Sequence, residues 1–299
     1  MDQNAPALTP TPTAAYSPTT VLNPLLKHFR NPSLYLKLPS QGSYWGAGSL
    51  TLPVTGELPI LPMTTRDEIT LKTPDALLNG QGVINVIESC CPSITNAWEM
   101  PSVDVDAIVI AIRIASYGHQ MDFGSECPHC GESNDYAIDL REVLEGVISP
   151  DYTKVIVTNG LTIKLKPQNY LSITKSSLIS FEEQQLLKTL GSFDAENKQQ
   201  MQQQFDVHLT KLIELNINTL TNCTDWIKTD DGVTVTDESF INEFYANCDN
   251  QIIKKINAQL AEFTKTAELP PHNVTCSECS KQFKVGINFD WASFFANGS

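Results

Sequence analysis

Hydrophobic positions in the first sixty residues form short runs that are typical of β-strands. The run Leu34–Leu38 is rich in β-forming residues, and Pro39–Gly42 after it has the composition of a turn. The runs Leu50–Leu52 and Leu58–Leu61 predict edge strands. Pro59 fits only an edge, because proline cannot donate a hydrogen bond to a central ladder.

Helical signals begin directly after this region. Thr64, followed by Asp67 and Glu68, predicts a helix start with a hydroxyl cap and acids in the first turn. The segment Thr73–Asp75 predicts another start, with proline at the first helical position. Apolar residues in Val83–Cys91 predict a third helix with a mostly buried face.

The most apolar helix is predicted to run from Asp104 or Asp106 to Tyr117, with Gly118 ending it. It is apolar on nearly every side, which is typical of a helix at the centre of a core. Arg113 lies within this run. We expect its guanidinium to pair with a carboxylate, because a buried charge without a partner is costly.

The pattern changes again after residue 150. Asn159–Gly160 favours a two-residue turn with positive φ, so Lys154–Leu165 predicts a β-hairpin. Asp230–Gly232 predicts a turn before Val233–Val235. Two apolar stripes at helical spacing predict long helices. The stripes are Phe205, Leu209, Leu212, Ile213, Ile217 and Leu220, and then Ile252, Ile253, Ile256, Leu260 and Phe263.

Two Cys-x-x-Cys turns lie far apart in the chain. Cys127 and Cys130 lie between strand-like segments, and so do Cys276 and Cys279. Such a turn lets two sulfurs reach one ion at ~2.3 Å, and two turns supply the four thiolates of a tetrahedral zinc site. We therefore predict a structural zinc on these four cysteines. The expected fold class is α+β, with a zinc-ribbon-like β module built from the two distant hairpins and with a helical insertion.

Other interpretations of these cysteines stay open. A gap of 145 residues separates Cys130 from Cys276, against roughly 15–20 in a compact ribbon. The pairs then bracket an inserted subdomain, or each pair completes its site with another chain. The thiols could also be buried without a metal. A thiol–disulfide oxidoreductase is a further alternative, but the polar, turn-like segment after Cys130 offers no helix that lowers a thiol pKa. His129 lies inside the turn and is not counted as a ligand.

Charge and composition limit the partners. The 299 residues suffice for one large or two modest domains, with a net charge of −14 and a pI near 4.7. Such a surface repels phosphate backbones and anionic membranes, so we expect neither nucleic acid nor a membrane as a partner. Residues 1–20 carry no secretory signal, and the longest apolar run, Ala107–Ala115, is too short to span a bilayer. A reducing compartment favours metal-bound thiolates over disulfides.

The sequence predicts no enzymatic activity. A metalloprotease helix motif, a nucleophile elbow and a phosphate-binding glycine loop are all missing from it. The five histidines are scattered and have no positioned nucleophile beside them. We therefore assign no catalytic residue.

Several short sequence motifs in the first part of the chain resemble motifs of one known protein family. They are Leu38–Gly42 with Tyr44, Pro62–Thr64 with Asp67 and Glu68, Thr73–Gly80, Ile112–Gly118, and the first cysteine turn with Gly131. In this order they resemble the baseplate proteins of contractile-tailed phages of the T-even type (T-four-like myoviruses), the baseplate hub and hub-assembly family. The helical region from Asp151 to Glu268 departs from that family.

The resemblance implies a non-catalytic part of the phage tail. The expected function is a structural component of the baseplate hub region, which joins or assembles baseplate subunits in the virion and is assembled in the host cytoplasm. The alternative is a hub assembly chaperone that is absent from the mature virion. Other baseplate, hub or tail subunits are the expected partners, and a homo-oligomer within the baseplate is possible.

The expected domain organisation has four parts. Residues 1–22, rich in Ala, Pro and Thr, predict an extended arm that cannot form a core. Residues 23–150 are expected to form a baseplate-like α+β core that contains the first Cys-x-x-Cys turn. Residues 151–267 are expected to form the β-hairpin and helical insertion. Residues 268–299 are expected to hold the second Cys-x-x-Cys turn and a C-terminal strand or helix.

Overall fold

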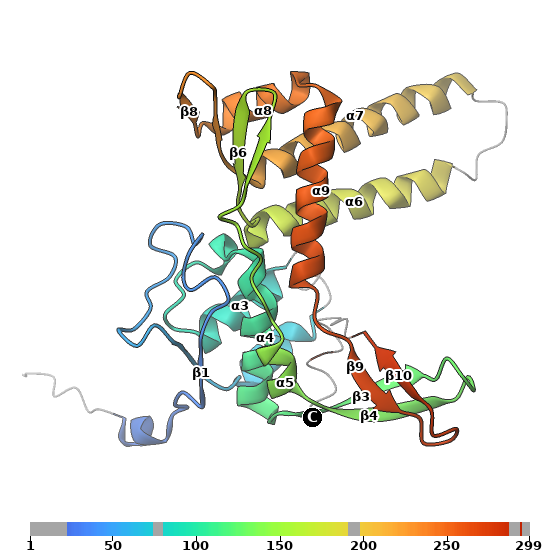
Figure 1. The fold of residues 1–299 in the computed structure, drawn as a ribbon. Helices are drawn as coiled ribbons and strands as arrows, with labels where there is room; N and C mark the ends of the chain where they lie inside the picture. Colours follow the sequence, from blue (N-terminus) through green and yellow to red (C-terminus); the bar gives the residue numbers. More distant parts are fainter. Residues whose placement is uncertain (1–22, 74–79, 191–197, 287–293, 295–299) are drawn as a thin grey trace, which may run out of the picture. The chain divides into compact units, whose positions relative to one another are not determined.

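The computed structural model describes residues 23–73, 80–190, 198–286 and 294 (Figure 1). Helices and small antiparallel sheets alternate along it, which confirms the mixed class expected from the sequence. The chain divides into two compact units, Met1–Asn31 and Pro32–Ser299. The first contains the short 3-10 helix η1 (Pro24–His28), which the Asn23 side chain caps. The predicted arm over residues 1–22 and the helix expected after Thr73 lie outside the described residues.

The first core of the second unit surrounds its most apolar helix. Its elements are β1 (Leu34–Leu36), β2 (Leu58–Ile60), α1 (Thr65–Leu71), α3 (Gln81–Cys90), η2 (Ala97–Glu99) and α4 (Ser102–Tyr117). Strands β1 and β2 pair antiparallel, so two of the predicted strands are confirmed. The helix start at Thr64 is confirmed too, because its hydroxyl and the carboxylate of Asp67 form a reciprocal capping box.

The strand predicted at Leu50–Leu52 is wrong. Leu50 makes a single bridge to Ile94, and no further ladder follows. The N–H of Thr51 donates to Ser93 O at 2.8 Å. The segment around Ile94 follows α3 as a turn and not as a strand, so pairing stops after one bridge.

Helix α4 begins at Ser102, two residues before the earliest start predicted for it. The N–H of Ser102 donates to Gln168 O at 2.8 Å, which anchors the first turn from outside the helix. Asp104 is fully buried and accepts from the N–H of Ser40 at 2.8 Å and from Trp45 Nε1 at 2.8 Å. Burial raises the pKa of Asp104, and these donors oppose that effect. Asp104 therefore anchors a distant loop instead of capping the helix.

Among the described residues no carboxylate pairs with Arg113, so that prediction is wrong. The side chain is 1 % exposed, and its Nε and Nη1 have no hydrogen-bond partner. Its guanidinium carbon lies 5.5 Å from the ring centre of Tyr117 and 5.4 Å from that of Phe294. Two aromatic faces therefore take the place of the expected ion pair. Burial lowers the pKa of Arg113.

A second core joins a four-stranded antiparallel sheet to helices. The strands, in spatial order, are β5 (Val155–Thr158), β6 (Leu161–Leu165), β7 (Thr224–Lys228) and β8 (Thr234–Val235). The predicted hairpin is confirmed, because Asn159 and Gly160 have φ of 49° and 76° and turn β5 into β6. Gly232, at φ 90°, supplies the predicted turn before β8.

Four helices complete the second half of the unit. They are α6 (Tyr170–Leu190), α7 (Lys198–Asn222), α8 (Glu238–Asn247) and α9 (Asn250–Ala267). The apolar stripe of α9 is buried at Ile252, Ile256 and Phe263. On α7 the stripe divides: Leu220 is buried, whereas Leu209 and Ile213 are 46 % and 51 % exposed. Helices α6 and α7 run side by side and extend away from the sheet (Figure 1).

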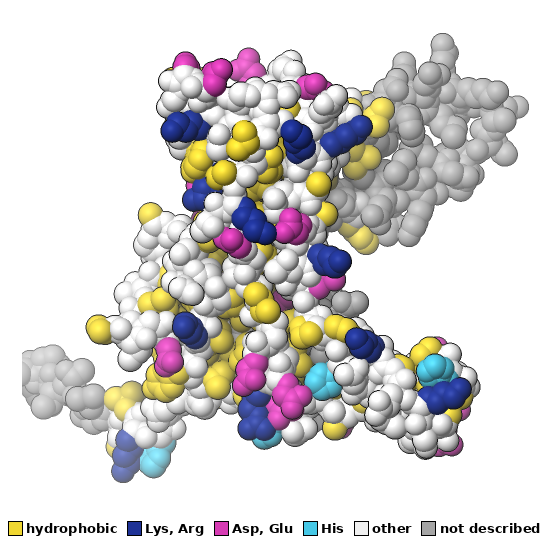
Figure 2. Space-filling model, viewed as in Figure 1, with side chains coloured by type: hydrophobic (Ala, Val, Ile, Leu, Met, Phe, Trp, Pro, Cys, Tyr) yellow, Lys and Arg dark blue, Asp and Glu magenta, His cyan; other side chains and the backbone are white. Residues whose placement is uncertain are grey.

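Charged side chains of both signs are interspersed on the face drawn in Figure 2, and lysines and arginines do not gather into one patch there. Nucleic-acid interfaces usually show such a basic patch. Within the described residues, no helix combines the length and the apolar character needed to cross a bilayer.

Candidate metal centre

Two β-hairpins carry the cysteine turns. Strands β3 (Gln120–Glu126) and β4 (Ser133–Asp139) pair antiparallel around the first turn, and β9 (His272–Thr275) and β10 (Gln282–Val285) pair around the second. No helix directly follows either cysteine pair, because β4 and β10 begin there. The sequence expectation that the segment after Cys130 is not helical is therefore confirmed.

The two turns have the same backbone hydrogen bonds. In each, the N–H of the first cysteine donates to the carbonyl five residues later, and the N–H four residues later donates to the carbonyl of that cysteine. The bonds are Cys127 N to Glu132 O (2.8 Å), Gly131 N to Cys127 O (2.9 Å), Cys276 N to Lys281 O (3.0 Å) and Ser280 N to Cys276 O (3.0 Å). This shared geometry places both sulfurs of each pair on one side of its turn.

The four predicted sulfurs meet at one point. Cys127 Sγ lies 3.7 Å from Cys279 Sγ, and Cys130 Sγ lies 3.7 Å from Cys276 Sγ. All four sulfurs lie within 4.8 Å of one another. A tetrahedron with metal–sulfur bonds of ~2.3 Å has edges of ~3.8 Å. The donor set and its spacing therefore fit a tetrahedral metal ion.

Burial differs among the four cysteines. Cys127 and Cys276, the first cysteine of each turn, are 1 % exposed. Cys130 is exposed and Cys279 is half-buried. The cluster thus has a closed inner side and an outer side that faces solvent.

Electrostatics within the cluster favour a cation. The N–H groups of Cys279 and Glu278 lower the pKa of the Cys276 thiol to about 7, against the effect of lost solvation. At Cys130 the N–H of Glu132 also lowers the pKa, but lost solvation and the other three sulfurs together raise it to about 12. Four thiolates this close repel one another, and a divalent ion relieves that repulsion.

Asn134 connects the two hairpins directly at the sulfurs. Its Nδ2 lies 3.7 Å from Cys276 Sγ, and its Oδ1 accepts from Ser277 Oγ at 2.6 Å. It therefore orients a proposed ligand of the opposite hairpin, as outer-shell residues of metal sites do. Sequence reasoning did not identify Asn134, because only the packing of the two hairpins brings it to the cluster.

A small apolar cluster supports the same junction. Tyr136, Val274 and Val285 are buried together, and Phe123 and Phe283 pack against them. The rings of Tyr136 and Phe283 meet edge to face, with centroids 5.8 Å apart. A cluster this small contributes modestly to folding on its own.

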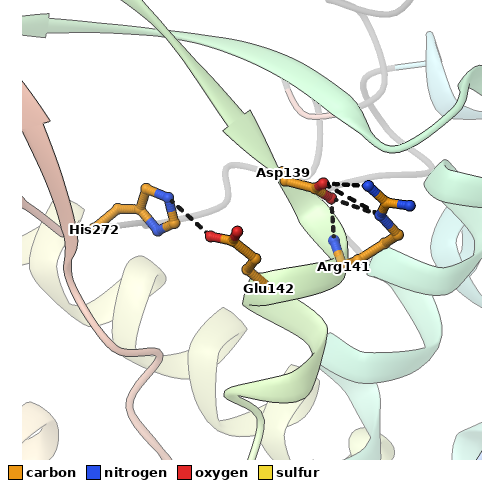
Figure 3. Close-up of polar contacts among 4 residues, drawn as sticks. All are labelled: Asp139, Arg141, Glu142 and His272. Carbon is orange, nitrogen blue, oxygen red and sulfur yellow. Dashed lines mark hydrogen bonds and ion pairs between the residues drawn. The ribbon is translucent and has the colours of Figure 1, made fainter.

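The second hairpin is also attached to helix α5 (Leu140–Glu145) (Figure 3). His272 Nε2 lies 3.6 Å from Glu142 Oε2, while Asp139 pairs with Arg141 at the start of the helix. The bond from Arg141 lowers the pKa of Asp139 to about 2. Just after α5, a Cβ on Gly146 would lie 2.6 Å from Pro270 Cγ, so only glycine permits this approach.

The remaining candidates lie elsewhere. His129 is exposed and does not belong to the four-sulfur group. Cys90 and Cys91 are buried in the first core, Cys248 packs against the second, and Cys223 is buried just before β7. Among the described residues, the four-cysteine group alone gathers three or more metal-binding side chains.

A family model, but neither a curated protein nor a solved structure, matches this chain. A family described as the T4 bacteriophage base plate protein matches residues 47–296. The match runs through residues 151–268 and corrects our expectation that this region departs from the family. It also spans all four cysteines. Because the match covers most of the sequence, the chain belongs to the T4 bacteriophage base plate protein family.

Proposed function

We propose that this chain is a structural, non-catalytic subunit of the hub region of a contractile phage baseplate, where a structural zinc joins its two distant hairpins. Family membership supports the baseplate role and association with other tail proteins. The observation that carries the zinc assignment is the meeting of four sulfurs, within 4.8 Å of one another, from turns 145 residues apart.

The proposed zinc has a purely structural role. Cys127, Cys130, Cys276 and Cys279 supply all four ligands, so no coordination position is left for substrate. When bound, the ion supplies four bonds that hold the two hairpins together. Zinc binding contributes ~10–16 kcal/mol to the folding of zinc-finger peptides. In this chain, zinc binding would hold together the two ends of the long segment between Cys130 and Cys276.

Exposed apolar side chains favour a role in assembly. On α6 and α7 they include Leu178, Phe181, Val207, Leu209 and Ile213, which are between 42 % and 55 % exposed. Large exposed apolar patches mark interaction sites in soluble proteins, and these side chains lie on two neighbouring helices. We propose that other baseplate subunits, or further copies of this chain, cover these helices in the virion.

Thiol–disulfide exchange is the enzymatic alternative, and the turn geometry disfavours it. A reactive cysteine in such enzymes lies at a helix N-terminus, which lowers its pKa. Here strand β4 follows the first turn and β10 follows the second. We expect the protein to reduce insulin no faster than a Cys127→Ser variant. Faster reduction by the unmodified protein would contradict a purely structural site.

The assembly role is tested in a phage that carries an early stop in this reading frame. Because a missing hub subunit blocks assembly, we expect heads without complete baseplates, and the protein should be present in purified tails from the unmodified phage. Normal contractile tails from the mutant would contradict the proposal. A defect with no copies in mature tails would instead identify the assembly chaperone that leaves before completion.

A further inference from the structure

A cavity of about 850 Å³ lies in the second unit, away from the cysteine cluster. It opens to solvent and is lined by the first half of α4, the segment after β6, and the C-terminal ends of α7 and α9. Val103, Leu260 and Phe263 give it apolar walls. Cavities of this size hold a ligand of a few residues.

Two polar groups that line this cavity have no hydrogen-bond or ion-pair partner in the part of the chain that the structure describes. The carboxylate of Asp106 makes no hydrogen bond or ion pair among the described residues, and burial raises its pKa. The Nε2 atom of Gln168 is buried and has no acceptor within the described segments. Asp106 is half-buried at the cavity wall, whereas Gln168 Nε2 is fully buried. A buried amide donor is normally satisfied, so Gln168 requires an explanation. One ligand that brings a donor to Asp106 and an acceptor to Gln168 provides it.

The charge of the cavity specifies the donor. Asp106, Glu268 and Lys166 are the charged residues along its walls. Burial raises the pKa of the Cys223 thiol to about 12, and the nearby positive charge of Lys166 opposes that rise. Lys166 forms no ion pair with Asp106. The walls therefore carry two acidic groups and one basic group, and a cationic group fits beside Asp106.

We propose that this cavity receives a basic segment of another tail protein. A Lys or Arg side chain of that segment pairs with Asp106, and a backbone carbonyl accepts from Gln168 Nε2. An apolar side chain packs on Phe263 and Leu260. The net charge of −14 favours a basic partner at encounter. This inference rests on the proposed structural role in the baseplate.

If Asp106 binds a partner, its carboxylate does not stabilise the free protein, but it does stabilise the assembly. Asp106→Asn removes a carboxylate that lacks a partner, so the isolated variant should melt at the same temperature as the unmodified protein or higher. The amide cannot form the ion pair, so incorporation into tails should fall at least about tenfold. Gln168→Leu should show the same opposed effects. Glu57→Gln removes one charge from an exposed position and should change neither measurement.

The direct test places a photo-crosslinking amino acid at Thr264 in the cavity wall and identifies the crosslinked peptide in purified tails. We expect a Lys- or Arg-containing segment of a different tail protein, and loss of that crosslink when Asp106→Asn is added. Crosslinks within this chain alone, an unchanged crosslink in the variant, or a lower melting temperature for Asp106→Asn would overturn the inference. Absence of the unmodified protein from tails would instead contradict the proposed structural role.

Discussion

Gly131 and Ser280 occupy equivalent positions in the two cysteine turns, and both have left-handed backbone conformations, with φ of 74° and 56°. Each donates its N–H to the carbonyl of the first cysteine in its turn. Glycine adopts this conformation freely, whereas serine adopts it at a cost of ~1–2 kcal/mol. The second turn therefore carries backbone strain that the first turn avoids.

This asymmetry predicts opposite responses to substitution. Gly131→Ala should lower the free energy of unfolding by ~1–2 kcal/mol, although its Cβ would meet nothing within 4 Å, because the backbone alone resists. Ser280→Gly should leave stability unchanged or raise it by up to ~1 kcal/mol, since relief of strain outweighs the greater chain entropy of glycine. Denaturant unfolding of the zinc-loaded protein measures both. A destabilising Ser280→Gly would show that the serine side chain, not its backbone, matters.

Asn134 should strengthen metal binding without being a ligand. Its contact with Cys276 Sγ and its bond from Ser277 orient one sulfur. Asn134→Ala should weaken zinc affinity ~10–100-fold, as removal of outer-shell partners does elsewhere. Competition with a chromophoric chelator measures this change. Ser133→Ala, at the exposed neighbouring position, is the matched control and should have no effect. Equal affinity in the two variants would remove Asn134 from the site.

The approach of Gly146 to Pro270 should be sensitive to a single methyl group. A Cβ there meets the proline ring at 2.6 Å and 3.0 Å, and a ring cannot swing aside as a flexible side chain can. Gly146→Ala should cost ~1–3 kcal/mol and increase hydrogen exchange in β9, because overpacking separates the helix from the strand. Gly286→Ala, where an added Cβ meets nothing within 4 Å, should be neutral. Similar protection of β9 in both variants would refute this account.

Arg113 should be replaceable by an apolar residue of similar length. Its Nε and Nη1 have no hydrogen-bond partner among the residues that the structure describes, and burial lowers its pKa, so the charge gains little from its surroundings. Arg113→Met should be neutral or stabilising, because a well-packed apolar side chain often replaces a buried charge without loss. Thermal unfolding measures the change. A loss above ~2 kcal/mol would mean that the two aromatic rings bind the guanidinium more strongly than we infer.

Local signals explain which elements the sequence could predict. The capping box of Thr64 with Asp67, the Asn159–Gly160 turn and the glycine that ends α4 each act within a few residues. The cysteine spacing likewise identified the four residues that the fold brings together. Elements defined by distant partners were missed or misjudged. Strand β7 pairs with β6 although the two long helices α6 and α7 lie between them in the sequence. Arg113 contacts Phe294, which is 181 positions later in the chain.

The metal content of the purified protein tests the central claim most directly. Elemental analysis of untagged protein, prepared without chelators, should find one zinc per chain. Cys279→Ser and Cys127→Ser should each lose most of that zinc, and both should loosen β3, β4, β9 and β10 together in hydrogen exchange, because each cysteine links one hairpin to the other. Cys248→Ser, a cysteine outside the cluster, should keep the metal. Protein that folds with both hairpins protected and contains no metal would contradict the account.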